Sequence, residues 1–309
     1  MNFLLIIAGL FLLVFGGNWL LKSAIAISLK LNISKVVVGM TVVSFATSAP
    51  ELIVSINAAL NGASDLALGN VIGSNIANLA LVLGITLLLG KMEVEKSFYK
   101  IDWPVMMVAS ALLFLFLAND NIILRHEGIL LFTFLIVFLV YLLRAQKNIE
   151  VEELEGEVSL SGFKTTLFLL MGGLGLWAGS ELLIKGATSL ALDFGVTERV
   201  IGVTVVSIGT SIPELAASII AVIKKEKAIS LGNLIGSNIF NILAVIGITS
   251  IITPISLSDE RLLTSDIYWM LGISFIILPM VLLPKKYTLN FKQGAILLLA
   301  YCIFIYLTL

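Results

Sequence analysis

Two short stretches of the sequence place an acid, a proline and two hydroxyls inside otherwise apolar segments. They read "TSAPE" at residues 47–51 and "TSIPE" at residues 210–214, and Glu51 and Glu214 fall near the middle of their segments. A charged residue at the centre of a membrane helix costs about 2.5–3.5 kcal/mol on insertion scales. No lysine or arginine is expected at the same depth to pair with these acids. The sequence therefore predicts a bound cation at this level of the membrane.

The prolines of these motifs interrupt the helix and so make neighbouring oxygens available as ligands. Pro50 and Pro213 lack an N–H, and each ring clashes with the carbonyl four residues earlier, on Ala46 and Gly209. Neighbouring carbonyls and hydroxyls can then turn toward a cation; they belong to Ser44, Thr47, Ser48, Ser207, Thr210 and Ser211. Such oxygens suit Ca²⁺ or Na⁺ rather than zinc or copper. The alternative is a simple proline kink whose hydroxyls bond to their own helix, and the two symmetric copies favour the ion site.

A second pair of motifs follows each acid. The sequences are "LGNVIGSNIAN" at 68–78 and "LGNLIGSNIFN" at 231–241, and the polar residues spaced four apart share one helix face: Ser74 with Asn78, and Ser237 with Asn241. These four side chains are predicted to face the acids. Helix packing is the simpler explanation for the other polar and small residues, which are Gly69, Asn70, Gly73, Asn75, Gly232, Asn233, Gly236 and Asn238.

Composition places these motifs in a membrane protein. Hydrophobic residues make up 59% of the 309 residues and charged residues only 13%, and the mean hydropathy is +1.09. The pattern predicts an all-α membrane protein with ten transmembrane helices. Their expected limits are 2–22, 33–59, 66–90, 102–119, 122–143, 164–186, 196–223, 228–252, 265–284 and 289–308. The first segment has no basic region before it and is interpreted as a helix rather than a signal peptide.

Composition also excludes several classes of function. No basic patch points to nucleic acid, the single cysteine, Cys302, rules out a disulfide framework, and the single histidine, His126, makes a histidine metal site or proton relay unexpected. The sequence therefore predicts no enzyme and no cofactor. We expect Ca²⁺ and Na⁺ as substrates and the lipid bilayer as surroundings, without an obligatory protein partner.

The two halves of the chain repeat one another. Both motif pairs recur at one offset, without a gap, so we expect a first five-helix repeat at 1–143 and a second at 164–309. An acidic loop at 144–163 separates them; it is most simply solvated, and a regulatory cation site there is the alternative. Because each half has an odd number of spans, the second must enter the membrane from the opposite side. Inverted repeats of this kind are typical of secondary transporters.

Basic residues predict the orientation. If the N-terminus lies outside, all but four of the 19 lysines and arginines fall on the inner side; the four are Arg125, Lys185, Arg199 and Arg261. This bias predicts that both termini face outward and that the acidic loop is cytoplasmic.

The paired motifs resemble the two alpha-repeats of the sodium/calcium exchangers, in the cation/calcium antiporter superfamily, and the resemblance covers essentially the whole chain. It implies a prokaryotic inner-membrane antiporter in which spans 2, 3, 7 and 8 bind the ions, while spans 1 and 6 are long tilted helices that slide across them. By position, the implied ligands are the carbonyls of Ser44 and Ser207 together with Thr47, Ser48, Glu51, Ser74, Asn78, Thr210, Ser211, Glu214, Ser237 and Asn241. Glu51 and Glu214 would bind Ca²⁺ with the carbonyls of Thr47 and Thr210, and the flanking oxygens would bind Na⁺.

The chain departs from parts of this family. Some relatives, including potassium-dependent ones, carry an acid where Asn241 stands, so potassium dependence is not expected. Ala46 replaces a glycine of the usual motif. The predicted function is exchange of Na⁺ for Ca²⁺ by alternating access. The nearest alternative is an H⁺/Ca²⁺ antiporter, or another Na⁺-coupled divalent cation exchanger. The proton-coupled branch has a glutamate where this chain has Gly73 and Gly236. A passive channel and a non-transporting scaffold explain the inverted repeat and buried acids less well.

Overall fold

A computed structural model describes residues 2–145, 160–194, 209–283 and 287–308, and the chain is almost entirely helical over these ranges. Nine helices in the described part are long and apolar enough to cross a membrane. A shorter apolar helix, α12 (Ile212–Ile223), continues a predicted span whose first residues lie outside the described ranges. The predicted all-α membrane fold is confirmed.

The elements of the two halves follow the same order. In the first half they are α1 (Asn2–Leu31), α2 (Lys35–Val38), η1 (Gly39–Val43), α3 (Ser44–Thr47), α4 (Ala49–Leu60), α5 (Ser64–Ile76), η2 (Ala77–Val82), α6 (Leu83–Leu89), β1 (Met92–Glu93), η3 (Phe98–Asp102), α7 (Trp103–Asp120), β2 (Ile122–Ile123) and α8 (Arg125–Ala145). The second half contains α9 (Gly162–Asp193), α12, α13 (Lys227–Phe240), η5 (Asn241–Ile246), α14 (Gly247–Ile252), β3 (Ile255–Ser256), η6 (Leu262–Asp266), α15 (Ile267–Leu282), β4 (Thr288–Leu289) and α16 (Phe291–Thr308). The η segments are short π-helical turns within longer helices.

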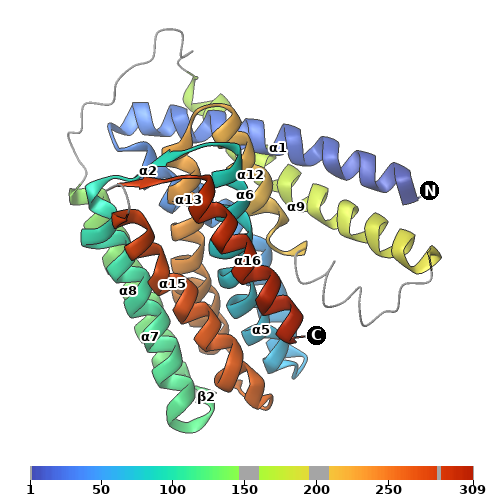
Figure 1. The fold of residues 1–309 in the computed structure, drawn as a ribbon, viewed down its shortest axis with the longest axis vertical. Helices are drawn as coiled ribbons and strands as arrows, with labels where there is room; N and C mark the ends of the chain where they lie inside the picture. The colour runs from blue at the N-terminus through green and yellow to red at the C-terminus, as the bar shows by residue number, and fades with distance from the viewer. Residues whose placement is uncertain (1, 146–159, 195–208, 284–286, 309) are drawn as a thin grey trace.

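Helices α1 and α9 lie side by side and run across the direction of α7, α8 and α15 (Figure 1). Glycines line their contact, because a Cβ atom at Gly9 would lie 2.8 Å from the Gly179 carbonyl oxygen, and one at Gly16 would lie 2.7 Å from the Leu176 nitrogen. Small residues allow two helix backbones to approach this closely. Both helices are longer than the predicted spans 2–22 and 164–186. A slanted helix needs more residues to cross the same thickness of lipid.

Two short antiparallel strand pairs tie the halves together at opposite ends of α7. Strand β1 pairs with β4, with Met92 opposite Leu289, and β2 pairs with β3, with Ile122 opposite Ser256. Each pair joins one strand from each half. We call the two ends of the molecule the β1–β4 face and the β2–β3 face.

Burial distinguishes the central helices from those around them. The central helices α5 and α13 are packed on nearly all sides, with Val71 and Leu234 completely buried. By contrast, large apolar side chains such as Phe11, Val137 and Phe163 on α1, α8 and α9 are exposed. A contiguous apolar exterior around a polar centre is the pattern expected of a protein surrounded by lipid.

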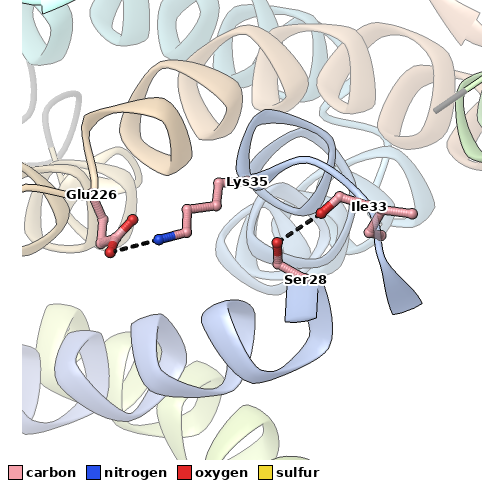
Figure 2. A network of polar contacts seen from close by, with 4 residues as sticks. All are labelled: Ser28, Ile33, Lys35 and Glu226. Carbon is pink, nitrogen blue, oxygen red and sulfur yellow. Dashed lines mark hydrogen bonds and ion pairs between the residues drawn. The ribbon is translucent and has the colours of Figure 1, made fainter. Parts of the chain in front are cut away.

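An ion pair crosses between the halves near the β1–β4 face (Figure 2). The Lys35 Nζ atom lies 3.0 Å from Glu226 Oε1, which joins the start of α2 to the turn between α12 and α13. The Ser28 hydroxyl donates to the Ile33 carbonyl at 2.7 Å, which fixes the turn between α1 and α2. These contacts fix the α1–α2 turn and hold the start of α2 against the turn between α12 and α13.

Candidate functional site

The two proline motifs form the same helix break. Ser48 has φ −88° and ψ 2°, and Ser211 has φ −88° and ψ 3°. A new helix begins directly after each, with its proline in the first turn, a position that needs no proline N–H. Glu51 and Glu214 therefore lie in the first turns of α4 and α12. The helix dipole favours negative charge at this position.

The residues before the first break are fixed by contacts to the other half. The Ser44 hydroxyl donates to the carbonyls of Gly39 and Asn233, at 2.9 Å each. The Ser44 carbonyl, predicted as a ligand, accepts the Ser48 amide at 2.9 Å and, more weakly, the Thr47 hydroxyl at 3.4 Å. Its predicted counterpart, Ser207, lies outside the described residues.

Further hydroxyl contacts cross between the two repeats. Thr47 Oγ1 lies 3.4 Å from Ser237 Oγ, and its symmetry mate joins Thr210 to Ser74 at 3.3 Å. In addition, the Ser48 hydroxyl donates to Glu214 Oε1 at 3.4 Å. The structure thus places the hydroxyls of each proline motif next to polar residues of the other half, namely Ser237 and Glu214 for the first motif and Ser74 for the second.

Four asparagines link α5 and η2 to α13 and η5 in a nearly two-fold arrangement. Asn75 Nδ2 donates to the Asn238 carbonyl at 3.3 Å, and Asn238 Nδ2 donates to the Asn75 carbonyl at 3.1 Å. Asn78 then donates to Asn238 Oδ1, and Asn241 donates to Asn75 Oδ1, both at 3.1 Å. The predicted packing role of Asn75 and Asn238 is confirmed. Sequence reasoning missed that they also orient the amides of Asn78 and Asn241.

The other two asparagines of these motifs donate within their own repeats, again as matched pairs, although Asn233 also accepts the Thr47 hydroxyl across the repeats at 3.2 Å. Asn70 donates to Ser55 Oγ at 3.0 Å, and Asn233 donates to Ser218 Oγ at 3.3 Å. Both contacts join the acid-bearing helix to the helix that follows it. These amides therefore brace the site from behind, which agrees with their predicted packing role.

Six buried oxygen atoms at this centre have no hydrogen-bond partner among the residues that the structure describes. They are both carboxylate oxygens of Glu51, Oε2 of Glu214, Oδ1 of Asn78, Oδ1 of Asn241 and the Ser211 hydroxyl. All five residues are at least 99% buried. A buried acceptor without a donor is costly, and folded proteins rarely leave one unsatisfied. A hard cation satisfies such a set, and Ca²⁺ takes six to eight oxygens.

The charge of the two acids is not offset by protein groups. Neither Glu51 nor Glu214 forms an ion pair with another residue in the described part of the chain, and the two repel each other. Nor do three or more His, Cys, Asp or Glu residues cluster anywhere in the described ranges, as zinc and iron sites commonly require. The site is a carboxylate pair completed by neutral oxygens.

Two halves that enter the membrane in opposite directions, with a buried acid pair between them, define a membrane transporter for small cations. The model of the sodium/calcium exchanger family matches residues 1–144 and 164–309, so the chain belongs to that family.

Individual relatives agree with this assignment. The chain is 38% identical to CaxA of Alkalimonas amylolytica, named as a candidate antiporter, over 98% of this chain and 97% of the relative. It is 30% identical to the sodium/calcium exchanger MaX1 of Methanosarcina acetivorans, over 98% and 97%. A solved structure of the sodium-calcium exchanger NCX_Mj, soaked with 10 mM Na⁺ and no Ca²⁺, superposes with a TM-score of 0.83 at 28% identity, covering 99% and 98%.

Proposed function

We propose that this protein is a secondary active antiporter that exchanges Na⁺ for Ca²⁺ by alternating access, without a cofactor and without catalysing a covalent reaction. The observation that supports it most strongly is the group of six unpartnered oxygens on Glu51, Asn78, Ser211, Glu214 and Asn241. These atoms come from both repeats, so a cation bound there contacts both halves.

The ligand set that we propose is the one expected from the sequence. Glu51 and Glu214 hold Ca²⁺ with the carbonyls of Thr47 and Thr210, and the surrounding hydroxyl, amide and carbonyl oxygens, including the carbonyls of Ser44 and Ser207, serve Na⁺. These surrounding ligands come from Ser44, Thr47, Ser48, Ser74, Asn78, Ser207, Thr210, Ser211, Ser237 and Asn241. Two carboxylates balance one Ca²⁺ or more than one Na⁺. Because both loads need the same oxygens, they compete, and this competition couples the two fluxes.

Alternating access follows from the packing of α1 and α9. Their shared glycine contact makes them one unit, and this unit meets the central helices through small or flexible groups. A Cβ atom at Gly173 would approach the Ala46 methyl at 3.7 Å, and Gly17 faces the flexible Ile220 side chain. We propose that the α1–α9 pair slides across the centre and exposes the site to each side in turn, as shear motions do.

The arrangement of the chain in the membrane is also part of the proposal. We place the β1–β4 face in the cytoplasm of a prokaryotic cell, because most lysines and arginines gather on that side and cytoplasmic loops carry the excess of positive charge. Both termini then lie outside the inner membrane. The repeats at 1–143 and 164–309 flank a cytoplasmic loop at 144–163, most of which lies outside the described residues.

The nearest alternative, proton coupling, has an observation against it. A Cβ atom at Gly236 would lie 2.6 Å from the Cα of Met40 and collide with the Ser44 hydroxyl. The glutamate that marks the proton-coupled branch therefore has no room here without displacing η1. Gly73, the equivalent position, has open space around it.

Calcium uptake into proteoliposomes tests the function. Vesicles loaded with Na⁺ and diluted into Na⁺-free medium should accumulate Ca²⁺ against its gradient, and the uptake should survive a protonophore. Vesicles with equal Na⁺ on both sides are the control. Uptake that ignores Na⁺ and follows an imposed pH gradient would favour the H⁺/Ca²⁺ alternative instead.

A further inference from the structure

A small cavity lies away from the exchange site, close to the β1–β4 face. Its space of about 10 Å³ has room for one water-sized sphere. It is enclosed by three elements: η3 with the loop before it, the α2–η1 helix and α13. The lining is apolar except for Glu95, Ser97 and Asp102.

Asp102 forms the buried floor of this cavity. The residue is only 2% exposed, and its Oδ1 atom has no hydrogen-bond partner in the described ranges. Glu95 lies at the solvent-exposed rim, and Ser97 lines the cavity together with both acids. Partial burial raises the pKa of the Glu95 carboxyl, and the nearby Ser97 hydroxyl opposes that change. Neither acid forms an ion pair with another described residue, although the two repel each other.

The second repeat contains an equivalent pair of acids, with a positively charged side chain beside it. Counted from the start of each π-helical turn, Asp259 and Asp266 correspond to Glu95 and Asp102. The local turns match as well, because the Phe98 amide donates to the Glu95 carbonyl and the Leu262 amide donates to the Asp259 carbonyl, both at 3.1 Å.

What differs is the residue directly before the turn. In the second repeat it is Arg261, whose guanidinium interacts favourably with Asp266. In the first repeat it is Ser97, which is neutral. One repeat therefore supplies a positive charge to its acid pair, while the other leaves a buried carboxylate oxygen facing a cavity of the size of one ion.

We infer that Glu95, Ser97 and Asp102 form a second cation site, separate from the exchange site, that takes one divalent hard cation of the Ca²⁺ class. Two carboxylates balance the charge of such an ion, and water entering at the Glu95 rim completes its oxygen shell. Because few protein oxygens are available, the affinity should be weak.

The position of this site gives it access to the exchange helices. Met40 lines the cavity from η1, directly before the segment that carries Ser44 and Thr47. Gly232 lines it from α13, and a Cβ atom there would collide with the Val36 carbonyl, so the two helices touch at this level. An ion bound here therefore contacts η3 beside a close contact between the two repeats.

The test is Ca²⁺ binding to the purified full-length protein in nanodiscs, measured by equilibrium dialysis with radioactive Ca²⁺ up to about 1 mM, the range of weak calcium sites. The exchange site is first disabled with the double variant Glu51→Gln/Glu214→Gln. This background should retain one bound Ca²⁺ per chain. Adding Ser97→Arg, which supplies the charge that the second repeat already has, should remove that ion. Adding Glu95→Gln/Asp102→Asn should do the same.

A matched control comes from the other repeat. Adding Asp259→Asn/Asp266→Asn to the background should leave the bound Ca²⁺ in place. A background that binds no Ca²⁺, or binding that Ser97→Arg leaves unchanged, overturns the second site. The exchange function is judged separately, from Na⁺-driven uptake in vesicles, so each idea can fail without the other.

Discussion

The two repeats agree at the centre of the membrane and differ at its surfaces. At the centre, the break at Ser48 has the backbone angles of the break at Ser211, and the bond from Asn78 to Asn238 has the length of the bond from Asn241 to Asn75. At the surfaces, Ser97 stands where the other repeat has Arg261. The central residues must serve one ion from two sides, whereas each surface meets a different compartment.

A turn near the surface shows the same divergence. Gly62 has φ 78° in the turn between α4 and α5, and Lys225 takes the equivalent place with φ 66°. Glycine adopts this left-handed region without strain, while a lysine does so at a cost. Symmetry is thus retained where ion binding demands it and relaxed where only a turn is needed.

Neutralising either of the two central acids should have the largest effect on transport. Glu51→Gln and Glu214→Gln should each abolish Na⁺-driven Ca²⁺ uptake, because the amide retains the size but removes half of the charge that offsets dehydration of Ca²⁺. Equal losses in the two variants are expected from the shared site. Glu181→Gln, on the exposed side of α9, is the control and should transport normally. Near-normal uptake by either central variant would contradict the proposed site.

Removing Asn75 or Asn238, which orient the amides of Asn241 and Asn78, should weaken the site without destroying it. Asn75→Ala frees the amide of Asn241, and Asn238→Ala frees that of Asn78. Loss of one such bond costs about 1 kcal/mol, so the Ca²⁺ concentration for half-maximal exchange should rise about fivefold in each variant. Exposed Asn61→Ala is the matched control. A change in only one of the two variants would show that the two repeats are not equivalent at this level.

A charge added at one of the two matched amides should change the pH dependence of exchange. Asn241→Asp places a third carboxylate beside Glu51 and Glu214, and a crowded buried carboxylate set can hold a proton that competes with Na⁺ and Ca²⁺. When exchange is measured while the pH is lowered, inhibition should then begin at a higher pH than in the parent. Asn61→Asp adds the same charge at an exposed position and should leave the profile unchanged. Superimposable profiles of parent and Asn241→Asp would place Asn241 outside the ion pocket.

The smallest effect is expected at the surface turns. Lys225→Gly should stabilise the protein by about 1 kcal/mol, because it relieves the left-handed strain, and Gly62→Ala should destabilise it by a similar amount. Thermal unfolding in detergent measures both. Lys224→Gly controls for loss of a positive charge. The two turn variants should change the stability in opposite directions. Changes in the same direction would mean that backbone strain does not decide which residue is preferred at this turn.

The sequence alone was sufficient for the class of fold and for most of the candidate ligands. Long apolar runs predict membrane helices because the bilayer fixes their length. The recurrence of "TSAPE" as "TSIPE" marks the acids as a pair because an unpartnered acid is so costly in lipid. The family resemblance led us to expect long helices at α1 and α9, but the hydropathy pattern underestimated their lengths, because tilt depends on how helices pack rather than on their hydropathy.

What only the tertiary structure decided is which oxygens are left over. Ser44, Thr47 and Asn78 are all polar and buried, and the sequence does not tell which of their atoms bond to protein. The answer depends on contacts across the repeats: Asn238 occupies the Asn78 amide and leaves its oxygen free, while Asn233 occupies the Ser44 hydroxyl. Hydrogen-bond partners far apart in sequence are chosen by packing in three dimensions. Residue types therefore determine the available ligand chemistry, and the fold determines which atoms remain for the ion.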